Sequence, residues 1–309
     1  MTEFKIVFAG SPPAAVPSLR ALAASRHRIA AVLTREDSPQ GRRRVITPTA
    51  VGAVAEELGI ATIKANRLRE EATAAVADAA PDLGVIVAYG GLVREPLLSL
   101  PRLGWINLHF SLLPHWRGAA PVQHALIAGD DLTGASVFQL VPELDAGDVF
   151  GSFTQQVGGN ETAGHLLASL AEGGAGLLVR VVDAIADGSA SAVPQVGDVS
   201  LAPKLGLEDG RIRWNEPAPR VHDRIRGVTP EPGAFTSVDD VHVKIADAVI
   251  ARDAARLVPG EIVLDGRRLL VGTLTDPIEL VTVQPAGKKP MAAADWWRGR
   301  PKTPGTAAS

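Results

Sequence analysis

An amide, an imidazole and a carboxylate stand at positions that one strand end and one loop can bring together. Asn107 and His109 lie two residues apart at the end of the apolar run 105–108, and Asp145 follows later in the chain. Side chains alternate between the two faces of a strand, so Asn107 and His109 would share a face while Leu108 points into a core. An amide can donate to a carbonyl oxygen that gains negative charge, an imidazole can move a proton or stabilise that charge, and a carboxylate can orient the imidazole or accept a proton through water. The three side chains therefore suit acyl transfer to an amine.

Spacing alone leaves simpler interpretations of these residues open. Asn and His at a strand end often satisfy backbone groups of the next loop, and an Asp close to a Gly is often a turn residue. A metal site is a weaker alternative, because no His-x-His pair couples to a carboxylate at ligand spacing. A nicotinamide cofactor is also disfavoured, since the turn after the first strand, Ala9-Gly10-Ser11-Pro12-Pro13, lacks the second and third glycines of the dinucleotide motif.

The first half of the chain alternates between strand-like and helix-like segments. Short apolar runs rich in β-branched residues predict buried strands, and apolar residues at helical spacing predict helices between them. This alternation predicts a parallel sheet with right-handed crossovers, whose ligands bind beyond the carboxyl ends of the strands, where Asn107 and His109 fall. The predicted strands are 5–9, 29–33, 83–88, 105–108, 135–140 and 152–157, and the predicted helices are 16–24, 49–58, 70–80 and 162–187.

The last third of the chain has a different pattern of apolar residues. Short apolar segments at 241–245, 261–266, 269–271 and 280–283 follow one another at hairpin spacing, which predicts a small β domain. The stretch before them is rich in small residues and has little periodicity. We therefore expect a catalytic domain over 1–188, a linker over 189–206 and a second domain over 207–309.

Composition limits the classes of protein that are possible. The 309 residues carry a net charge of −3, so contact with a nucleic acid would need local clusters of cations rather than an overall positive field. The absence of Cys excludes disulfides, thiolate nucleophiles and Cys-ligated zinc. We expect a soluble, cytoplasmic protein, because no secretory signal opens the chain and no run approaches the ~18 apolar residues of a membrane span.

Several separate islands of the sequence resemble the folate-dependent formyltransferases. They agree with that family in order and spacing over almost the whole chain, although Phe110 stands where the family usually has a small residue. The islands are Phe8-Ala9-Gly10-Ser11-Pro12, Gly41-Arg42-Arg43-Arg44, Val87-Ala88-Tyr89-Gly90, Asn107-Leu108-His109, Ser111-Leu112-Leu113-Pro114, Trp116-Arg117-Gly118-Ala119-Ala120-Pro121, Gly134 to Gly147 and Gln284-Pro285-Ala286-Gly287-Lys288-Lys289-Pro290-Met291.

The resemblance implies a fold, a formyl donor and site residues. The fold would be α/β, a Rossmann-like parallel sheet followed by a small OB-like barrel. Asn107, His109 and Asp145 would be catalytic, the donor would be 10-formyltetrahydrofolate, and no metal would take part. The residues implied to meet the folate are Ser111, Leu112, Leu113, Pro114, Val87, Tyr89 and Gly90.

The resemblance also implies an RNA-borne acceptor. Formyl transfer would go to the α-amine of methionine carried by initiator tRNA, with no membrane involved and the protein a monomer. A charge run in a loop is usually only a solvated tip, but the loop that carries Arg42 is longer than a simple strand–helix connection needs. The implied tRNA contacts are Arg42, Arg43, Arg44, Lys288 and Lys289.

Three other functions stay open at this point. A formyltransferase that acts on a nucleotide sugar or a glycinamide compound would need neither the basic loop nor the second domain. A non-catalytic RNA-binding protein would not need Asn107, His109 and Asp145. A hydrolase of formyl-folate would use water in place of the amine with the same three residues.

Overall fold

A computed structural model describes residues 2–41, 44–300 and 307–308 of the protein. The chain forms two compact units. The first comprises Met1–Pro121, Thr133–Gln155 and Leu167–Ala202, and the second comprises Val122–Leu132, Gln156–Leu166 and Pro203–Ser309.

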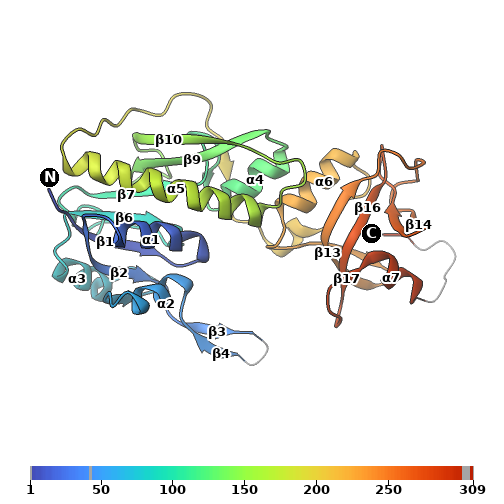
Figure 1. Cartoon of the computed structure of the whole chain (residues 1–309), viewed down its shortest axis with the longest axis horizontal. Helices are drawn as coiled ribbons and strands as arrows, with labels where there is room; N and C mark the ends of the chain where they lie inside the picture. Colours follow the sequence, from blue (N-terminus) through green and yellow to red (C-terminus); the bar gives the residue numbers. More distant parts are fainter. Residues whose placement is uncertain (1, 42–43, 301–306, 309) are drawn as a thin grey trace. The chain divides into compact units, whose positions relative to one another are not determined.

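The first unit is built on a seven-stranded sheet with the order β10-β9-β7-β6-β1-β2-β5 (Figure 1). The pairs β5–β2, β2–β1, β1–β6 and β6–β7 are parallel, as the alternating strands and helices predicted, and β9 runs antiparallel to β7. The strands are β1 (Lys5–Gly10), β2 (Arg28–Thr34), β5 (Thr62–Lys64), β6 (Leu83–Val87), β7 (Trp105–His109), β9 (Leu132–Gln139) and β10 (Val149–Gln156).

Helices join these strands, and those predicted at 16–24, 49–58, 70–80 and 162–187 lie close to the observed ones. They are α1 (Val16–Ala23), α2 (Ala50–Glu57), α3 (Glu70–Asp78), α4 (Pro121–Ala128) and α5 (Ala163–Ala186), with a short 3-10 turn over Pro13–Ala15. The start of α2 has a physical cause, because the Thr49 side chain accepts a hydrogen bond from the Gly52 N–H at 2.9 Å and so caps the first turn.

The long helix α5 lies on one face of the sheet (Figure 1). Among the described residues it is the one helix long and apolar enough, by length and composition, to cross a membrane, and half of its apolar window is buried. Its glycines let it approach the strands closely: a Cβ added at Gly174 would come within 2.8 Å of Leu108, and one at Gly173 within 2.9 Å of Phe153. The apolar side of α5 therefore packs on the sheet.

The basic segment between β2 and α2 forms a hairpin instead of the expected loop. Strands β3 (Ser38–Gln40) and β4 (Val45–Thr47) pair antiparallel, and the hairpin projects away from the main sheet (Figure 1). The β-branched run at 45–47 favours this pairing. Arg42 and Arg43 lie outside the described residues.

The small-residue stretch after α5 makes specific contacts with the first unit. Val193 forms a bridge to Val149, and β11 (Leu201–Ala202) pairs parallel with β8 (Arg117–Gly118). Residues up to 202 therefore lie along the loops that follow β7 and β9.

The second unit contains the antiparallel strands that hairpin spacing predicted. Their order is β12-β13-β16-β15-β14, with β17 on β16, and α6 packs against β13. Buried residues such as Trp214, Ile245 and Val283 form its core. The elements are the 3-10 turn Leu207–Gly210, α6 (Ala218–Gly227), β12 (Ala234–Val238), β13 (Val241–Ile250), β14 (Ile262–Asp265), β15 (Arg268–Val271), β16 (Ile278–Pro285), β17 (Met291–Ala292) and α7 (Ala293–Arg298).

Candidate active site

Asn107 and His109 lie at the carboxyl end of β7 and share one face of the sheet. Leu108 points to the opposite face, which α5 covers. In the antiparallel pairing with β9, Asn107 is opposite Phe138, and the Phe138 ring meets the His109 ring edge-on with centroids 6.4 Å apart. The strand thus places both polar side chains beside an apolar wall.

The geometry around His109 determines which ring nitrogen carries the proton. Nε2 lies 2.8 Å from the backbone carbonyl oxygen of Trp116. A carbonyl oxygen only accepts hydrogen bonds, so Nε2–H donates and the neutral ring keeps its lone pair on Nδ1. Nδ1 faces Asp145 Oδ2 at 3.8 Å, outside direct hydrogen bonding but close enough for the carboxylate to stabilise a proton that Nδ1 takes up.

Burial sets the charge state of His109. The side chain is 6% exposed, and this desolvation lowers the pKa of His109 below the ordinary histidine value. The Asp145 carboxylate and the hydrogen bond to the Trp116 carbonyl act in the opposite direction, but they are smaller causes. His109 is therefore a neutral base at neutral pH, with Nδ1 as its basic atom.

Asp145 is held in place by the backbone of the loop after β7. Its Oδ2 accepts a hydrogen bond from the Gly118 N–H at 2.8 Å. The residue adopts a φ of 46°, in the left-handed region that Asp tolerates better than most residues. Such a conformation persists only where surrounding contacts hold it, so the carboxylate beside His109 is placed by tertiary structure.

The carboxamide of Asn107 makes no hydrogen bond within the described part of the chain, and the residue is half-buried. A half-buried amide without a protein partner can donate to a bound molecule. Since His109 lies two residues further on the same face, one bound molecule can meet both side chains.

The turn after β7 carries four of the predicted folate residues. Ser136 on β9 holds this turn, because its Oγ donates to the Ser111 carbonyl at 2.8 Å and accepts from the Leu113 N–H at 3.2 Å. Ser111 and Pro114 are buried, whereas Leu112 and Leu113 are half-buried. The two leucines are therefore the side chains with exposed surface in this turn.

The other predicted folate segment lies at the end of β6 and is partly buried. Val87 and Tyr89 are buried, and the Tyr89 hydroxyl donates to the Ala65 carbonyl at 2.6 Å. Burial raises the pKa of Tyr89, so the hydroxyl stays a donor. Gly90 is exposed with a φ of 83°. Tyr89 thus anchors this segment from the core, and Gly90 is its exposed end.

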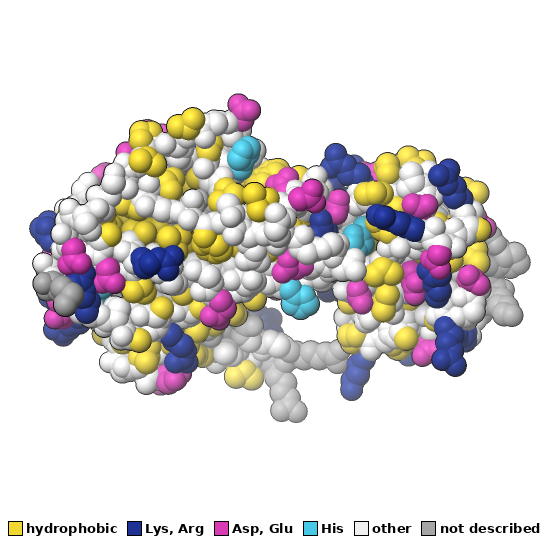
Figure 2. All heavy atoms as spheres, turned by 45° about the horizontal axis from the view of Figure 1, so that its top comes forward, with side chains coloured by type: hydrophobic (Ala, Val, Ile, Leu, Met, Phe, Trp, Pro, Cys, Tyr) yellow, Lys and Arg dark blue, Asp and Glu magenta, His cyan; other side chains and the backbone are white. Residues whose placement is uncertain are grey.

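Of the predicted RNA contacts, the three that the structure describes, Arg44, Lys288 and Lys289, are exposed. Arg44 stands in the turn of the β3–β4 hairpin, beside the undescribed Arg42 and Arg43, and in the second unit Lys288 and Lys289 stand in the turn after β16. On the face drawn in Figure 2, Lys and Arg side chains are scattered among Asp and Glu rather than gathered in one field. This face therefore offers RNA no continuous field of positive charge.

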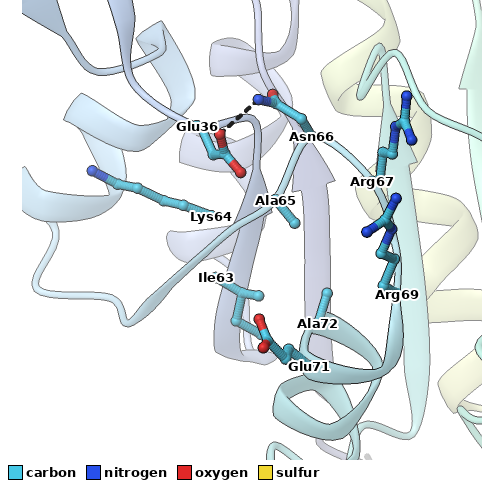
Figure 3. Close-up of a pocket in the computed structure, with 9 residues that line it drawn as sticks. All are labelled: Glu36, Ile63, Lys64, Ala65, Asn66, Arg67, Arg69, Glu71 and Ala72. Atoms are coloured by element: carbon cyan, nitrogen blue, oxygen red, sulfur yellow. Dashed lines mark hydrogen bonds between the residues drawn. The ribbon is translucent and has the colours of Figure 1, made fainter.

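A pocket of about 440 Å³ between the end of β5 and the start of α3 adds two cations that the sequence analysis did not single out. Figure 3 shows the guanidinium groups of Arg67 and Arg69 on the same side of this pocket. Lys64 also lines it and pairs with Asp37 at 2.8 Å, at the base of the hairpin. The available signal was the position of Arg67 and Arg69 directly after a strand and before a helix, at the carboxyl edge of the sheet.

No group of three or more His, Asp or Glu side chains that could hold a metal ion occurs in the ranges 2–41, 44–300 and 307–308. The remaining polar groups at the site are an amide donor, a neutral imidazole base and a carboxylate, and these are suited to acyl transfer.

The fold and this arrangement of side chains define a class of protein. Residues 4–182 match the formyl transferase family model, and residues 204–301 match the model of the formyl transferase C-terminal domain. The chain belongs to the formyl transferase family.

Individual relatives are similar over nearly their full length. A protein of Leifsonia xyli subsp. xyli named methionyl-tRNA formyltransferase is 62% identical, and one of Clavibacter sepedonicus with the same name is 61% identical; each match covers 96% of this chain and 97% of the relative.

Solved structures with far lower sequence identity share the fold. WlaRD, described as a sugar 3N-formyl transferase in the presence of dTDP and 5-N-formyl-THF, has a TM-score of 0.69 at 15% identity and covers 94% of this chain and 100% of its own. HypX from Aquifex aeolicus, in complex with tetrahydrofolic acid, has a TM-score of 0.64 at 16% identity and covers 96% of this chain and 47% of its own.

Proposed function

We propose that this protein transfers the formyl group of 10-formyltetrahydrofolate to the α-amine of methionine esterified to initiator tRNA. The observation that carries the proposal is the similarity to relatives named methionyl-tRNA formyltransferase, which extends over 96% of the chain at 62% and 61% identity. The side chains at the end of β7 supply groups that this chemistry needs.

In this proposal His109 takes the proton of the attacking amine. The amine nitrogen forms a bond to the formyl carbon and must then lose a proton. Nδ1 of His109 accepts it, because the ring is neutral and its Nε2–H is already donated to the Trp116 carbonyl. The imidazolium that results lies beside Asp145 Oδ2, whose negative charge stabilises it.

Asn107 stabilises the charge that builds on the formyl oxygen. The electron pair displaced from the C=O bond resides on that oxygen, and the Asn107 amide donates a hydrogen bond to it, assisted by the positive charge on His109. Loss of one such donor typically costs about 10²- to 10³-fold in rate. When the C=O bond re-forms, the bond to folate N10 breaks, and N10 takes the proton that His109 received from the amine, which returns the imidazole to its neutral form.

The folate is bound between two segments of the first unit. Ser111, Leu112, Leu113 and Pro114 form one side, where Leu112 and Leu113 offer apolar surface to the ring system. The backbone from Val87 to Gly90, with Tyr89 anchored in the core, forms the other side.

The tRNA is held by positively charged side chains. Arg42, Arg43 and Arg44 of the hairpin meet the acceptor stem, Arg67 and Arg69 lie at the neighbouring pocket, and Lys288 and Lys289 contact the RNA from the second unit. We assign catalysis to residues 1–188, RNA binding to residues 207–309 and the link between them to residues 189–206. The protein acts as a monomer in the cytoplasm.

One assay tests the proposal and its rivals together. Radiolabelled formyl transfer from 10-formyltetrahydrofolate is measured with methionyl initiator tRNA, with free methionine, with an amino sugar nucleotide and with no amine. We expect label on the tRNA and none on free methionine. Transfer to the amino sugar alone would identify a small-amine formyltransferase, and release of formate without any amine would identify a hydrolase.

A further inference from the structure

The small-residue segment after α5 contacts both loops that hold the catalytic groups. Strand β11 lies against β8, so closely that a Cβ added at Gly118 would come within 2.6 Å of the Ala202 carbonyl oxygen. The Trp116 N–H donates to Ser200 Oγ at 2.9 Å, and the Arg117 N–H donates to the Ser200 carbonyl at 2.9 Å. Residues 193–202 thus border the loop whose Trp116 carbonyl orients His109.

Within this segment Gln195 links that loop to the Asp145 loop. Its Nε2 donates to the carbonyl oxygens of Asp145 at 2.8 Å and of Gly147 at 2.9 Å. Its Oε1 accepts from Arg117 Nε at 3.1 Å and from Arg117 Nη2 at 2.6 Å. A carboxamide has two N–H donors and one oxygen with two lone pairs, so all of its hydrogen-bonding capacity is used here.

The two loops that Gln195 joins are the two that define the surroundings of His109. One loop carries the Trp116 carbonyl, and the other carries the Asp145 carboxylate. Asp145 has its left-handed φ of 46° at the carbonyl that Gln195 holds. A change in this link would therefore move Asp145 relative to His109 Nδ1.

We propose that Gln195 is a positioning residue for formyl transfer, which ties Arg117 to the backbone of Asp145 and Gly147 and so sets the separation of the Asp145 carboxylate from His109. This inference rests on the proposed roles of His109 and Asp145. All four side-chain hydrogen bonds of Gln195 go to Arg117, Asp145 and Gly147, so it acts through Asp145.

The most informative variant is Gln195→Glu, which keeps the shape and the acceptor for Arg117 but places a carboxylate oxygen against two carbonyl oxygens. Misplacement of a catalytic group by about 1 Å can cost on the order of 10²-fold in rate. We expect kcat to fall about 10- to 10²-fold while the KM values for tRNA and for formyl-folate change little. Gln195→Met removes both polar functions without adding charge. It should likewise lower kcat and leave both KM values little changed.

The control is the same substitution at Gln155, which lies on β10 and accepts a hydrogen bond from Ser169 Oγ at 3.2 Å. Gln155→Glu should retain wild-type kcat and KM. Thermal unfolding of all variants, read by circular dichroism, should give melting temperatures near that of the wild type.

A double-mutant cycle with Asp145→Asn separates positioning from a general structural effect. If Gln195 acts through Asp145, Gln195→Glu should cost little further kcat in the Asp145→Asn background, because the group it positions has lost its charge. The proposal would be overturned if the two substitutions lowered kcat independently, so that the loss in the double variant equalled the product of the two single losses. It would also be overturned if both Gln195 variants kept a near-normal kcat.

Failure of the proposed function would look different. A wild-type protein that transfers no formyl group to methionyl-tRNA would refute the function, and an Asp145→Asn variant with full activity would refute the role of Asp145. The Gln195 proposal itself fails if wild type is active and Asp145→Asn is impaired but the cycle shows no coupling.

Discussion

The end of β7 and the basic β3–β4 hairpin belong to the same unit, but their ionisable side chains differ in exposure to water. The His109 side chain is 6% exposed and that of Asp145 11%, and each has a hydrogen bond to backbone, whereas Arg44 is exposed in a turn. Removal from water strengthens electrostatic effects and shifts the His109 pKa, as proton transfer requires. An exposed cation keeps its charge and can meet a phosphate with little rearrangement. In the proposed function, proton transfer therefore falls to the buried region and attraction of RNA to the exposed one.

The largest effect should come from the buried region. His109→Ala and Asn107→Ala are each expected to lower turnover by at least ~10²-fold, because both act mainly on charge in the transition state. Steady-state formylation and thermal melting check this, and the melting temperatures should stay near wild type. The exposed His165 and Asn160 provide matched controls, whose Ala variants should keep full turnover. Near-normal turnover of His109→Ala or Asn107→Ala would show that the buried pair is structural.

Asp145→Asn should separate binding from turnover. The amide preserves the shape and removes the charge that supports His109, so we expect turnover to fall roughly 10- to 10²-fold while folate binding is kept. Titration calorimetry with the folate and single-turnover kinetics measure the two quantities. Equal loss of both would mean that Asp145 is a turn residue that holds the pocket together.

The pH dependence of turnover tests the effect of burial directly. Burial lowers the pKa of His109, so the neutral base should persist below the ordinary histidine value of 6.5, and kcat should fall on the acid side with a midpoint below that value. The Asp145 carboxylate raises the same pKa, and its removal in Asp145→Asn should move the acid limb to still lower pH. Profiles of kcat against pH for the wild type and Asp145→Asn check the direction of this shift. An acid limb that moves to higher pH in the variant would contradict it.

The exposed region should show a smaller, salt-dependent effect. Replacement of Arg42, Arg43 and Arg44 together by Ala should raise the KM for tRNA and leave the affinity for formyl-folate unchanged. The slope of log affinity against log salt should become shallower by roughly 0.9 for each duplex phosphate that the protein no longer neutralises. Arg28, exposed at the start of β2, is a control cation, and Arg28→Ala should leave the slope unchanged. If the slope of log affinity against log salt were the same for the triple variant and the wild type, the hairpin would not contact RNA. That result would favour a small-amine substrate.

The smallest effect is expected at the pocket beside the hairpin. The double substitution Arg67→Ala/Arg69→Ala removes two exposed cations and should weaken tRNA binding about 5- to 10-fold, since each exposed charge contact is worth at most about 1 kcal/mol. Filter binding at low and high salt measures it. Unchanged tRNA binding at low salt would show that this pocket does not contact the RNA.

Local sequence patterns were sufficient to predict many of the helices and strands of this protein. Residue alternation along β7 placed Asn107 and His109 on one face. Helical spacing predicted a helix over 49–58, which the structure has at Ala50–Glu57 after Thr49 caps its first turn. The hairpin spacing of the last third predicted the antiparallel strands. The paired strands β3 and β4 were not predicted, because each has three residues and the expected loop left no room for a periodic signal.

The sequence by itself determined that Asn107 and His109 share one face at the end of β7, because the alternation of side chains along a strand is a local property of the chain. Only the tertiary structure decided that the Trp116 carbonyl orients His109, that the Gly118 N–H holds Asp145 and that Gln195, 50 residues after Asp145, joins the two loops. These are single hydrogen bonds to the backbone in irregular segments. They depend on where separate loops come together in space, and no periodicity of the sequence encodes that.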